Sequence, residues 1–278
     1  MLKIISILLI VSALISKSSL ASEPIISIKT KTDIRLFTKS ELLKRTDLKD
    51  FTISDAPAYP DQKINLKAVK VSSLFEGIKI SHNAVVQFRA IDGFAAPISK
   101  DRILNESPDQ SIAYIAIEPT SDKWPPLSLG KPSAGPFYLI WENPKLSNIG
   151  PEEWPFMLAS FEIKSSLIGL YPQIFPKNTV PEDSPVQEGF RVFTKNCFAC
   201  HTLNKTGPSQ IGPDLNFPLN PTEYFSEQNL RKLIRDPQSI RNWPKSKMSG
   251  FSDEFLSNTE LNNLIEYLKH MAKIKSTS

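Results

Sequence analysis

The feature that most constrains this chain is the run Cys197-Phe198-Ala199-Cys200-His201, in its last third. Two thiols three residues apart lie on about one helical turn, so both can add to the vinyl groups of one porphyrin. The histidine that follows is then held beside the ring, where its imidazole can ligate the iron. This C-x-x-C-H spacing predicts one covalent haem c, attached through Cys197 and Cys200, with His201 as the proximal ligand.

The same five residues allow three other interpretations. A C-x-x-C pair can be a redox dithiol, but that motif belongs near a βαβ pattern, which this sequence does not show. A closed structural zinc site needs four ligands, and the chain has only these two cysteines. A structural disulfide remains possible in an oxidising compartment.

The first residues have the pattern of a secretory signal. Lys3 supplies a positive charge, residues 4–15 are apolar, and Ser19-Leu20-Ala21 offers a cleavage site. We therefore expect residues 1–21 to be a signal peptide, and the mature protein to be periplasmic in a bacterium, with no membrane span. The apolar run is shorter than the about 20 residues of a membrane helix. The alternative is an uncleaved N-terminal segment that anchors the protein to the membrane, facing the periplasm.

The length and charge of the chain limit the number of domains and the classes of function that fit it. A chain of 278 residues exceeds the common size of one domain, so we expect two. Cleavage after residue 21 would remove Lys3 and Lys17 and leave 31 basic against 29 acidic residues. This near-balance argues against a protein that binds nucleic acid.

Residues 22–171 are expected to form a β-rich α+β domain. Capping boxes at Thr38-x-x-Glu41 and Ser73-x-x-Glu76 predict two short helices, and Asp92-Gly93 predicts a turn. Strands outnumber helices and the two do not alternate as βαβ units. The predicted strands are residues 34–37, 85–91, 112–117, 137–141 and 158–163.

Part of this domain resembles the sulfite-oxidase-type molybdopterin-binding domain. The resemblance rests on residues 88–94, a strand ending in an Asp-Gly-aromatic turn, on the apolar run 113–117, and on residues 67–74 before that strand. That family holds its molybdenum through a Cys thiolate in this domain, whereas this chain has no cysteine before Cys197. The resemblance therefore implies a sulfite-oxidase-like fold without a molybdenum cofactor, used for binding something else or for docking.

Several segments of this domain place aromatic residues beside prolines. They are residues 124–126, 134–137 and 152–156, which include Trp124 and Trp154. Buried aromatic residues often anchor interfaces, so these segments could form a recognition surface. The alternative is that they pack against the core of their own domain.

Residues 172–184 are expected to be a linker, because Pro172, Pro176 and Pro181 favour a semi-rigid extended chain. A helix then begins at Pro185, with Asp183 or Ser184 as its cap. The capping box Ser257-x-x-Glu260 starts a last helix that carries an apolar stripe. Gly189 on the first of these helices would let the last one cross closely.

Residues 185–278 resemble a class I cytochrome c, which implies an all-α cytochrome c fold. The segment Gly212-Pro213-Asp214-Leu215 matches the loop that lies against the proximal histidine in that family. The resemblance implies that the carbonyl of Pro213 accepts a hydrogen bond from the ring of His201 and so orients it.

Met248 is our candidate for the distal ligand. It lies in an expected loop 47 residues after His201, within the usual range of the family, although the usual Met-Pro dipeptide is Met-Ser here. The competitors in this half of the chain are Met271, on the apolar stripe, and His270; Met157 belongs to the other domain.

Two axial ligands leave no open site on the iron, so we expect one-electron transfer rather than an enzyme. The N-terminal domain would dock a redox partner such as a dehydrogenase, an oxidase or another cytochrome. Basic residues near Met248 either form a solvated face or steer an acidic partner: Arg231, Lys232, Arg235, Arg241, Lys245 and Lys247. The alternative function is a cytochrome subunit or fused domain of an oxidoreductase, either molybdenum-type or haem-based.

Overall fold

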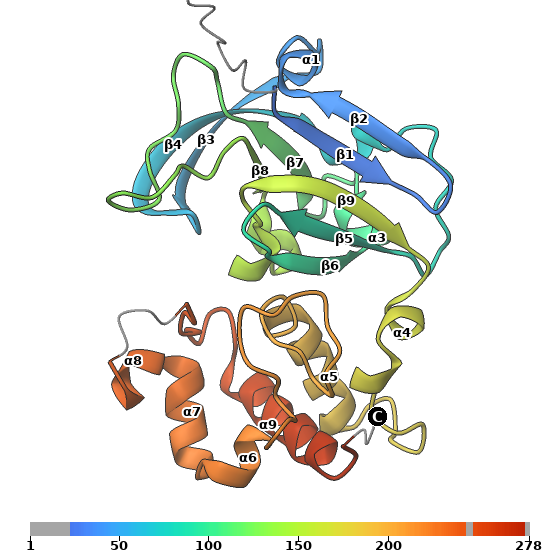
Figure 1. Cartoon of the computed structure of the whole chain (residues 1–278), viewed down its shortest axis with the longest axis vertical. Coiled ribbons are helices and arrows are strands. Elements are labelled where there is room, and N and C mark those ends of the chain that lie inside the picture. Colours follow the sequence, from blue (N-terminus) through green and yellow to red (C-terminus); the bar gives the residue numbers. More distant parts are fainter. Residues whose placement is uncertain (1–22, 243–246, 276–278) are drawn as a thin grey trace, which may run out of the picture.

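The computed structural model describes residues 23–242 and 247–275, with a β-rich N-terminal domain above a helical C-terminal domain (Figure 1). The predicted signal peptide and Lys245 lie outside these residues. Within the described ranges, no helix has both the length and the apolar character to cross a membrane. The division into a β-rich part and a helical part, predicted from the sequence, is confirmed.

One sheet of the N-terminal domain has five strands in the order β2-β1-β9-β5-β6. Neighbouring strands are antiparallel except β1 and β9, which are parallel. The first and last strands of the domain therefore lie side by side at the centre of this sheet. The strands are β1 (Ile25–Lys29), β2 (Ile34–Thr38), β5 (Val85–Ala90), β6 (Ala95–Ser99) and β9 (Leu158–Lys164).

The second sheet has four antiparallel strands in the order β3-β4-β7-β8. All residues of β7 are buried, and side chains of both sheets share one hydrophobic core. The strands are β3 (Lys49–Ala56), β4 (Tyr59–Lys70), β7 (Ile112–Ile117) and β8 (Phe137–Glu142). Five short helices connect them: α1 (Lys39–Leu43), α2 (Val71–Leu74), α3 (Lys100–Ile103), and the 3-10 helices η1 (Pro144–Ser147) and η2 (Pro151–Glu153).

The two capping boxes predicted in this domain have different outcomes. The Thr38 hydroxyl accepts from the Glu41 amide, and the Glu41 carboxylate accepts from the Thr38 amide at 2.7 Å, so the first is confirmed. The second is wrong, because Ser73 lies inside α2 rather than before it. Since β4 extends to Lys70, the helical turn starts at once, and the Ser73 hydroxyl donates to the Lys70 carbonyl instead.

The aromatic and proline-rich segments do not form a surface of exposed tryptophans. Trp124 and Trp154 are each 6% exposed and belong to the hydrophobic core. The ring centroid of Tyr138, on β8, lies 6.4 Å from that of Trp124 and 6.3 Å from that of Trp154. Packing of these indoles against the core, the alternative interpretation, is therefore correct, and a recognition surface built on them is wrong.

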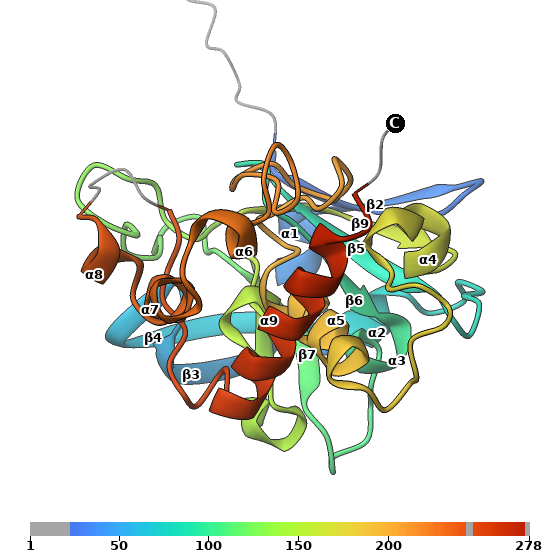
Figure 2. The same cartoon turned by 90° about the horizontal axis from the view of Figure 1, so that it is seen from below.

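The C-terminal domain is organised around two long helices, α5 (Pro185–Asn196) and α9 (Asn258–Ala272), which pack across each other (Figure 2). A Cβ atom at Gly189 of α5 would lie 1.9 Å from the carbonyl oxygen of Asn263, so the predicted close crossing depends on glycine. Capping by Ser184 and the capping box at Ser257 are both confirmed. Among the residues that the structure describes, this domain also has the shorter helices α6 (Pro221–Tyr224), α7 (Glu227–Arg235) and α8 (Pro237–Ile240).

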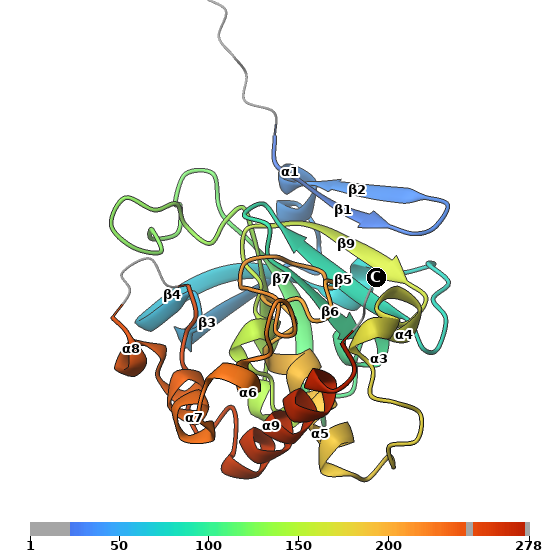
Figure 3. The ribbon, with the colours of Figure 1, turned by 60° about the horizontal axis from the view of Figure 1, so that its bottom comes forward.

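The connection between the domains is not a plain extended spacer. Helix α4 (Leu167–Leu170) follows β9 (Figure 3). The 3-10 helix η3 (Pro172–Ile174) comes next. Ile174 is fully buried in the core of the C-terminal domain, and its carbonyl accepts a hydrogen bond of 2.6 Å from the hydroxyl of Tyr267. The start of the predicted linker is therefore part of the helical domain.

Several segments of the N-terminal domain contact the helical domain directly, among them η2 and the turn between β5 and β6. The 3-10 helix η2 packs against α5. In the turn between β5 and β6, the carbonyl of Gly93 accepts a hydrogen bond of 3.4 Å from the hydroxyl of Ser209. The two domains thus meet beside the C-terminal end of α5, where the C-x-x-C-H run begins.

Candidate haem site

The C-x-x-C-H run continues from the end of α5 in a tight turn. Cys197 caps the helix, and its carbonyl accepts from the amides of Cys200 at 3.1 Å and of His201 at 2.9 Å. Phe198 and Ala199 between the thiols are buried in the protein. This turn brings Cys197, Cys200 and His201 to the wall of one cavity.

The cavity has a volume of about 830 Å³. It is lined by all five site residues predicted from the sequence: Cys197, Cys200, His201, Pro213 and Met248. Most of the remaining wall is apolar and comes from α7, α9 and the segments beside them. Helices α7 and α9 contribute Leu230, Leu233, Ile234, Leu264 and Leu268.

The imidazole of His201 is oriented by the backbone of the next loop. Its Nδ1 lies 2.8 Å from the carbonyl oxygen of Pro213. A carbonyl can only accept, so Nδ1 carries the proton and Nε2 keeps a free lone pair. Burial lowers the pKa of His201, which favours the neutral ring at neutral pH. The ring is therefore ready to act as a metal ligand through Nε2.

Gly212 allows this loop to pass close to the ring. A Cβ atom at Gly212 would lie 2.5 Å from Cε1 of His201, which leaves no room for a side chain. The Gly212 amide donates to the Cys200 carbonyl at 2.8 Å, and the Leu215 amide donates to the Thr202 carbonyl at 2.9 Å. The loop is thus paired with the backbone around the histidine.

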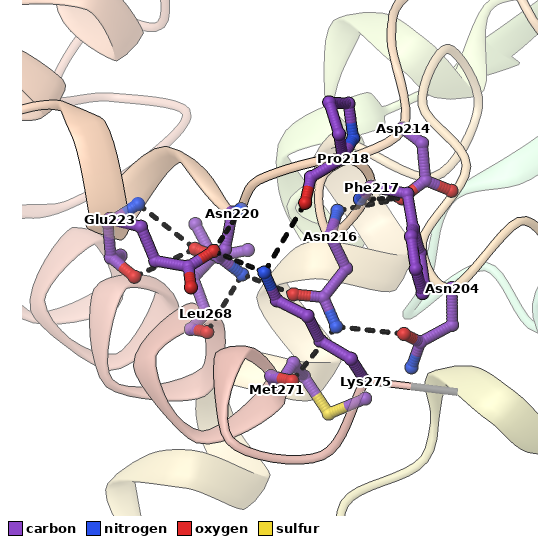
Figure 4. Close-up of polar contacts among 11 residues, drawn as sticks. Asn204, Asp214, Asn216, Phe217, Pro218, Asn220, Glu223, Leu268, Met271 and Lys275 are labelled. Carbon is purple, nitrogen blue, oxygen red and sulfur yellow. Dashed lines mark hydrogen bonds and ion pairs between the residues drawn. The ribbon is translucent and has the colours of Figure 1, made fainter. Parts of the chain in front are cut away.

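Two buried asparagines then fasten the loop to α9 (Figure 4). The Asn216 amide group donates to the Asn204 side chain at 2.8 Å and to the carbonyl of Met271 at 2.9 Å. The Asn220 amide group donates to the Asn216 side chain at 2.9 Å and to the carbonyl of Leu268 at 3.0 Å. These contacts fix the proximal side of the cavity to the longest helix of the domain.

The candidates for the distal ligand occupy different places. Among the methionines that the structure describes, Met248 is the one that lines the cavity. Met271 is fully buried in the core of the helical domain. His270 is engaged elsewhere, because its Nε2 accepts a hydrogen bond of 3.3 Å from the amide of Lys177.

The segment after Met248 is held by α7. The guanidinium of Arg235 donates to the carbonyl of Phe251 at 2.9 Å and to the carbonyl of Leu256. Gly250 passes so close to α7 that a Cβ atom there would lie 2.1 Å from the carbonyl oxygen of Arg235. These contacts keep the chain around Met248 against the helix that forms one wall of the cavity.

The two thiols do not have the properties of a redox dithiol. Burial raises the pKa of Cys197 and that of Cys200 to about 12. Dithiol oxidoreductases need a thiolate near neutral pH, and their attacking cysteines have lowered pKa values.

Glu152 and Asn196 are among the cavity-wall residues that sequence reasoning missed. Asn196 is 4% exposed, and both polar atoms of its side chain have no hydrogen-bond partner among the described residues. Glu152 reaches the cavity from η2 of the N-terminal domain. The only local signal for Asn196 was its place next to Cys197, and the sequence around Glu152 carries no signal of a haem site.

The residues that are present fit a haem. Two thiols, a histidine with a free Nε2 and a thioether face one largely apolar cavity, and Gly212 leaves the histidine ring space. A c-type haem is attached to the protein through two cysteine sulfurs, and its iron is ligated by imidazole and thioether groups in cytochromes c. When bound, the group would be held by Cys197 and Cys200 and would supply a redox-active iron.

Comparison with known proteins supports this assignment for the helical part. Residues 186–272, about a third of the chain, match the family model described as Cytochrome c. No curated protein matches the chain. The match does not include the N-terminal domain, so its resemblance to the sulfite-oxidase-type domain stays a prediction. The C-terminal part of this chain is thus similar to the Cytochrome c family, whose members bind haem c covalently and transfer electrons.

Proposed function

We propose that this protein is an exported mono-haem c-type cytochrome that carries single electrons between redox partners. The observation that carries the proposal is the convergence of Cys197, Cys200, His201 and Met248 on one cavity inside a cytochrome c domain. The haem supplies an iron that changes between the ferric and ferrous states, and axial His and Met would place its potential in the upper range for haem proteins.

Each residue of the cavity has a separate task in this proposal. Cys197 and Cys200 hold the group by thioether bonds, and Pro213 keeps His201 in the tautomer that presents Nε2. Met248, which lines the same cavity, would supply the second protein ligand of the iron, and no coordination site would then remain for a substrate. The apolar walls from α7 and α9 exclude water and keep the surroundings rigid.

Export is proposed from the N-terminal sequence, which lies outside the described residues. Cleavage after Ala21 would release a mature protein that begins at Ser22 in the periplasm. N-terminal sequencing of protein isolated from its native membrane-free fraction tests this directly. An N-terminus at Met1, together with recovery in the membrane fraction, would instead support the anchored alternative.

We propose that the N-terminal domain docks the redox partner, which we expect to be a dehydrogenase, an oxidase or another cytochrome. The tryptophans are buried, but β2 forms one edge of the five-stranded sheet and carries Ile34 and Leu36, which are 58% and 57% exposed. Lys29 lies opposite Ile34 on β1, so the apolar strip has a basic neighbour. An edge strand with exposed apolar side chains is suited to binding another protein surface.

The haem assignment is tested with the full-length protein and a double variant. Changing Cys197 and Cys200 together to Ala should abolish the covalent haem stain on a denaturing gel, whereas the wild-type band should stain. The reduced wild-type spectrum should not change on addition of carbon monoxide, because Met248 fills the sixth position. A spectrum that shifts with carbon monoxide would favour a haem enzyme or a gas sensor over a carrier.

Metal analysis separates the carrier from a molybdenum oxidoreductase. We expect iron at one equivalent per chain and no molybdenum, because the only cysteines are Cys197 and Cys200. Stoichiometric molybdenum in the full-length protein would overturn the cofactor-free interpretation of the N-terminal domain.

The docking role is tested by changing Ile34 and Leu36 to Ser, which should slow electron exchange with the native partner and leave the haem spectrum unchanged.

A further inference from the structure

One residue of the N-terminal domain lies in the wall of the haem cavity. Glu152 is the middle residue of η2, and it lines the cavity together with Cys197 and Cys200. All the other described residues of the wall come from position 196 or beyond. The N-terminal domain thus contributes a carboxyl group to a site that otherwise belongs to the cytochrome domain.

The backbone that carries Glu152 is fixed by its neighbour. Glu153 accepts two hydrogen bonds from the guanidinium of Arg102, at 2.5 and 2.9 Å, and a third of 2.9 Å from the amide of Gly150. The Glu153 carbonyl accepts from the indole nitrogen of Trp141 at 2.7 Å. Because η2 is anchored to α3 and β8 in this way, the direction of Glu152 is set by the fold of its own domain.

The same turn is packed on the end of the helix that leads into the haem motif. A Cβ atom at Gly150 would lie 3.5 Å from the side-chain oxygen of Asn196 and 3.5 Å from Cε of Lys195. Asn196 lines the cavity and immediately precedes Cys197. Glu152 is therefore held at the side of the cavity where the thiols attach the haem.

Glu152 makes no hydrogen bond or ion pair with any described residue, and burial raises the pKa of its carboxyl to about 7. Its charge also raises the pKa of both cysteine thiols, which places it within electrostatic reach of them. Other charged groups around the cavity are Asp92, which acts on Cys200, and the lining residues Arg241 and Lys247. Lys195 is not among the residues that line the cavity, and it lies within electrostatic reach of Glu153 and Glu260.

We propose that Glu152 is an electrostatic residue of the redox centre: the N-terminal domain holds its carboxylate beside the thioether edge of the haem, where the negative charge lowers the reduction potential. The ferric state carries one more positive charge than the ferrous state, so a nearby carboxylate stabilises it more. The effect is large in a partly desolvated site, where screening is weak. The inference rests on the proposed haem site and gives the N-terminal domain a role in addition to docking.

The test compares full-length haem proteins by potentiometric titration at pH 8.5, followed through the visible absorption bands. Glu152→Gln removes the charge and keeps the shape, so its midpoint should rise. At the wild-type midpoint, the ratio of ferrous to ferric protein should then increase severalfold. Glu152→Asp keeps the charge and should stay near the wild-type midpoint. Asp122→Asn removes an exposed acid of the same domain and should leave the midpoint unchanged.

Three outcomes decide the inference. A midpoint potential that rises in Glu152→Gln, but not in Glu152→Asp or Asp122→Asn, supports the inference. No rise in Glu152→Gln overturns it, and so does an equal rise in Glu152→Asp, which would indicate a packing effect rather than a charge effect. Glu152→Ala provides a second neutral variant if Glu152→Gln folds poorly. Failure of the proposed function is recognised separately, because wild-type protein would then show no covalent haem stain.

Discussion

The ring of Tyr171 packs edge-to-face on the ring of Phe198, with the two ring centroids 5.0 Å apart. Phe198 lies between the two haem cysteines, and the hydroxyl of Tyr171 donates a hydrogen bond of 2.9 Å to the side chain of Gln87 on β5. Tyr171 therefore joins the sheet of the N-terminal domain to the haem motif. This contact and η2 give the two domains a defined arrangement around the cavity.

Tyr171→Phe should destabilise the protein by about 1–3 kcal/mol, because it leaves the buried Gln87 carbonyl oxygen without a donor. Tyr171→Leu should cost a further 0.5–1.5 kcal/mol or so, since the ring contact with Phe198 is lost as well. Urea denaturation of the two variants, followed by far-UV circular dichroism, measures both steps. Equal stability of wild type and Tyr171→Phe would contradict a role for this hydrogen bond.

Gly189→Ala should weaken the crossing of α5 and α9. The new Cβ would lie 1.9 Å from the carbonyl oxygen of Asn263, so the helices must separate, at a cost of about 1–3 kcal/mol or more. Gly169→Ala in α4 is the matched control, because its nearest neighbours are serine hydroxyls at 3.1 and 3.4 Å. In thermal unfolding, the midpoint temperature should fall clearly for Gly189→Ala and change little for Gly169→Ala.

Met248→Ala should remove the weak near-infrared absorption that a sulfur–ferric bond gives to the oxidised protein. Met248 is the described methionine that lines the cavity, whereas Met271 is fully buried in the core. Met271→Leu, which preserves most of the buried volume, serves as the control and should retain the band. Loss of the band in Met271→Leu, with its retention in Met248→Ala, would show that the ligand assignment is wrong.

A fragment that begins at residue 166 should be more stable than one that begins at residue 185. The shorter fragment lacks Ile174, whose side chain is fully buried and whose carbonyl accepts from Tyr267. Loss of a buried side chain of this size costs about 2–5 kcal/mol.

Both fragments lack Glu152, so their midpoint potentials should lie above that of the full-length protein. Denaturant titration and potentiometry on the same samples check the two expectations.

The midpoint potential should fall as the pH rises through about 7. The raised pKa of Glu152 means that the carboxyl is mainly protonated below this pH and ionised above it, and only the ionised form favours the ferric state. The difference in midpoint between wild type and Glu152→Gln should therefore be small near pH 5.5 and largest near pH 8.5. A difference that is constant across this range would show that Glu152 does not titrate there.

The sequence alone determined the features that depend on neighbouring residues. The spacing of Cys197, Cys200 and His201 follows from covalent chemistry on one turn, and the caps at Thr38, Ser184 and Ser257 each accept from the amide three residues away. Strand β7, a continuous apolar run, was also predicted with correct bounds, and β2, β5, β8 and β9 were predicted to within one residue at their C-terminal ends. Such patterns are local, so no knowledge of the fold is needed to interpret them.

Other features were decided by the tertiary structure. Strands β3 and β4 carry many charged residues on their exposed face, and the sequence did not indicate them because their pairing with each other and with β7 supplies the order. Trp124 and Trp154 become core residues only when the two sheets pack together. Glu152 and Cys197 line one cavity from two domains, and residues so distant in sequence come to the same cavity only through the packing of η2 on α5.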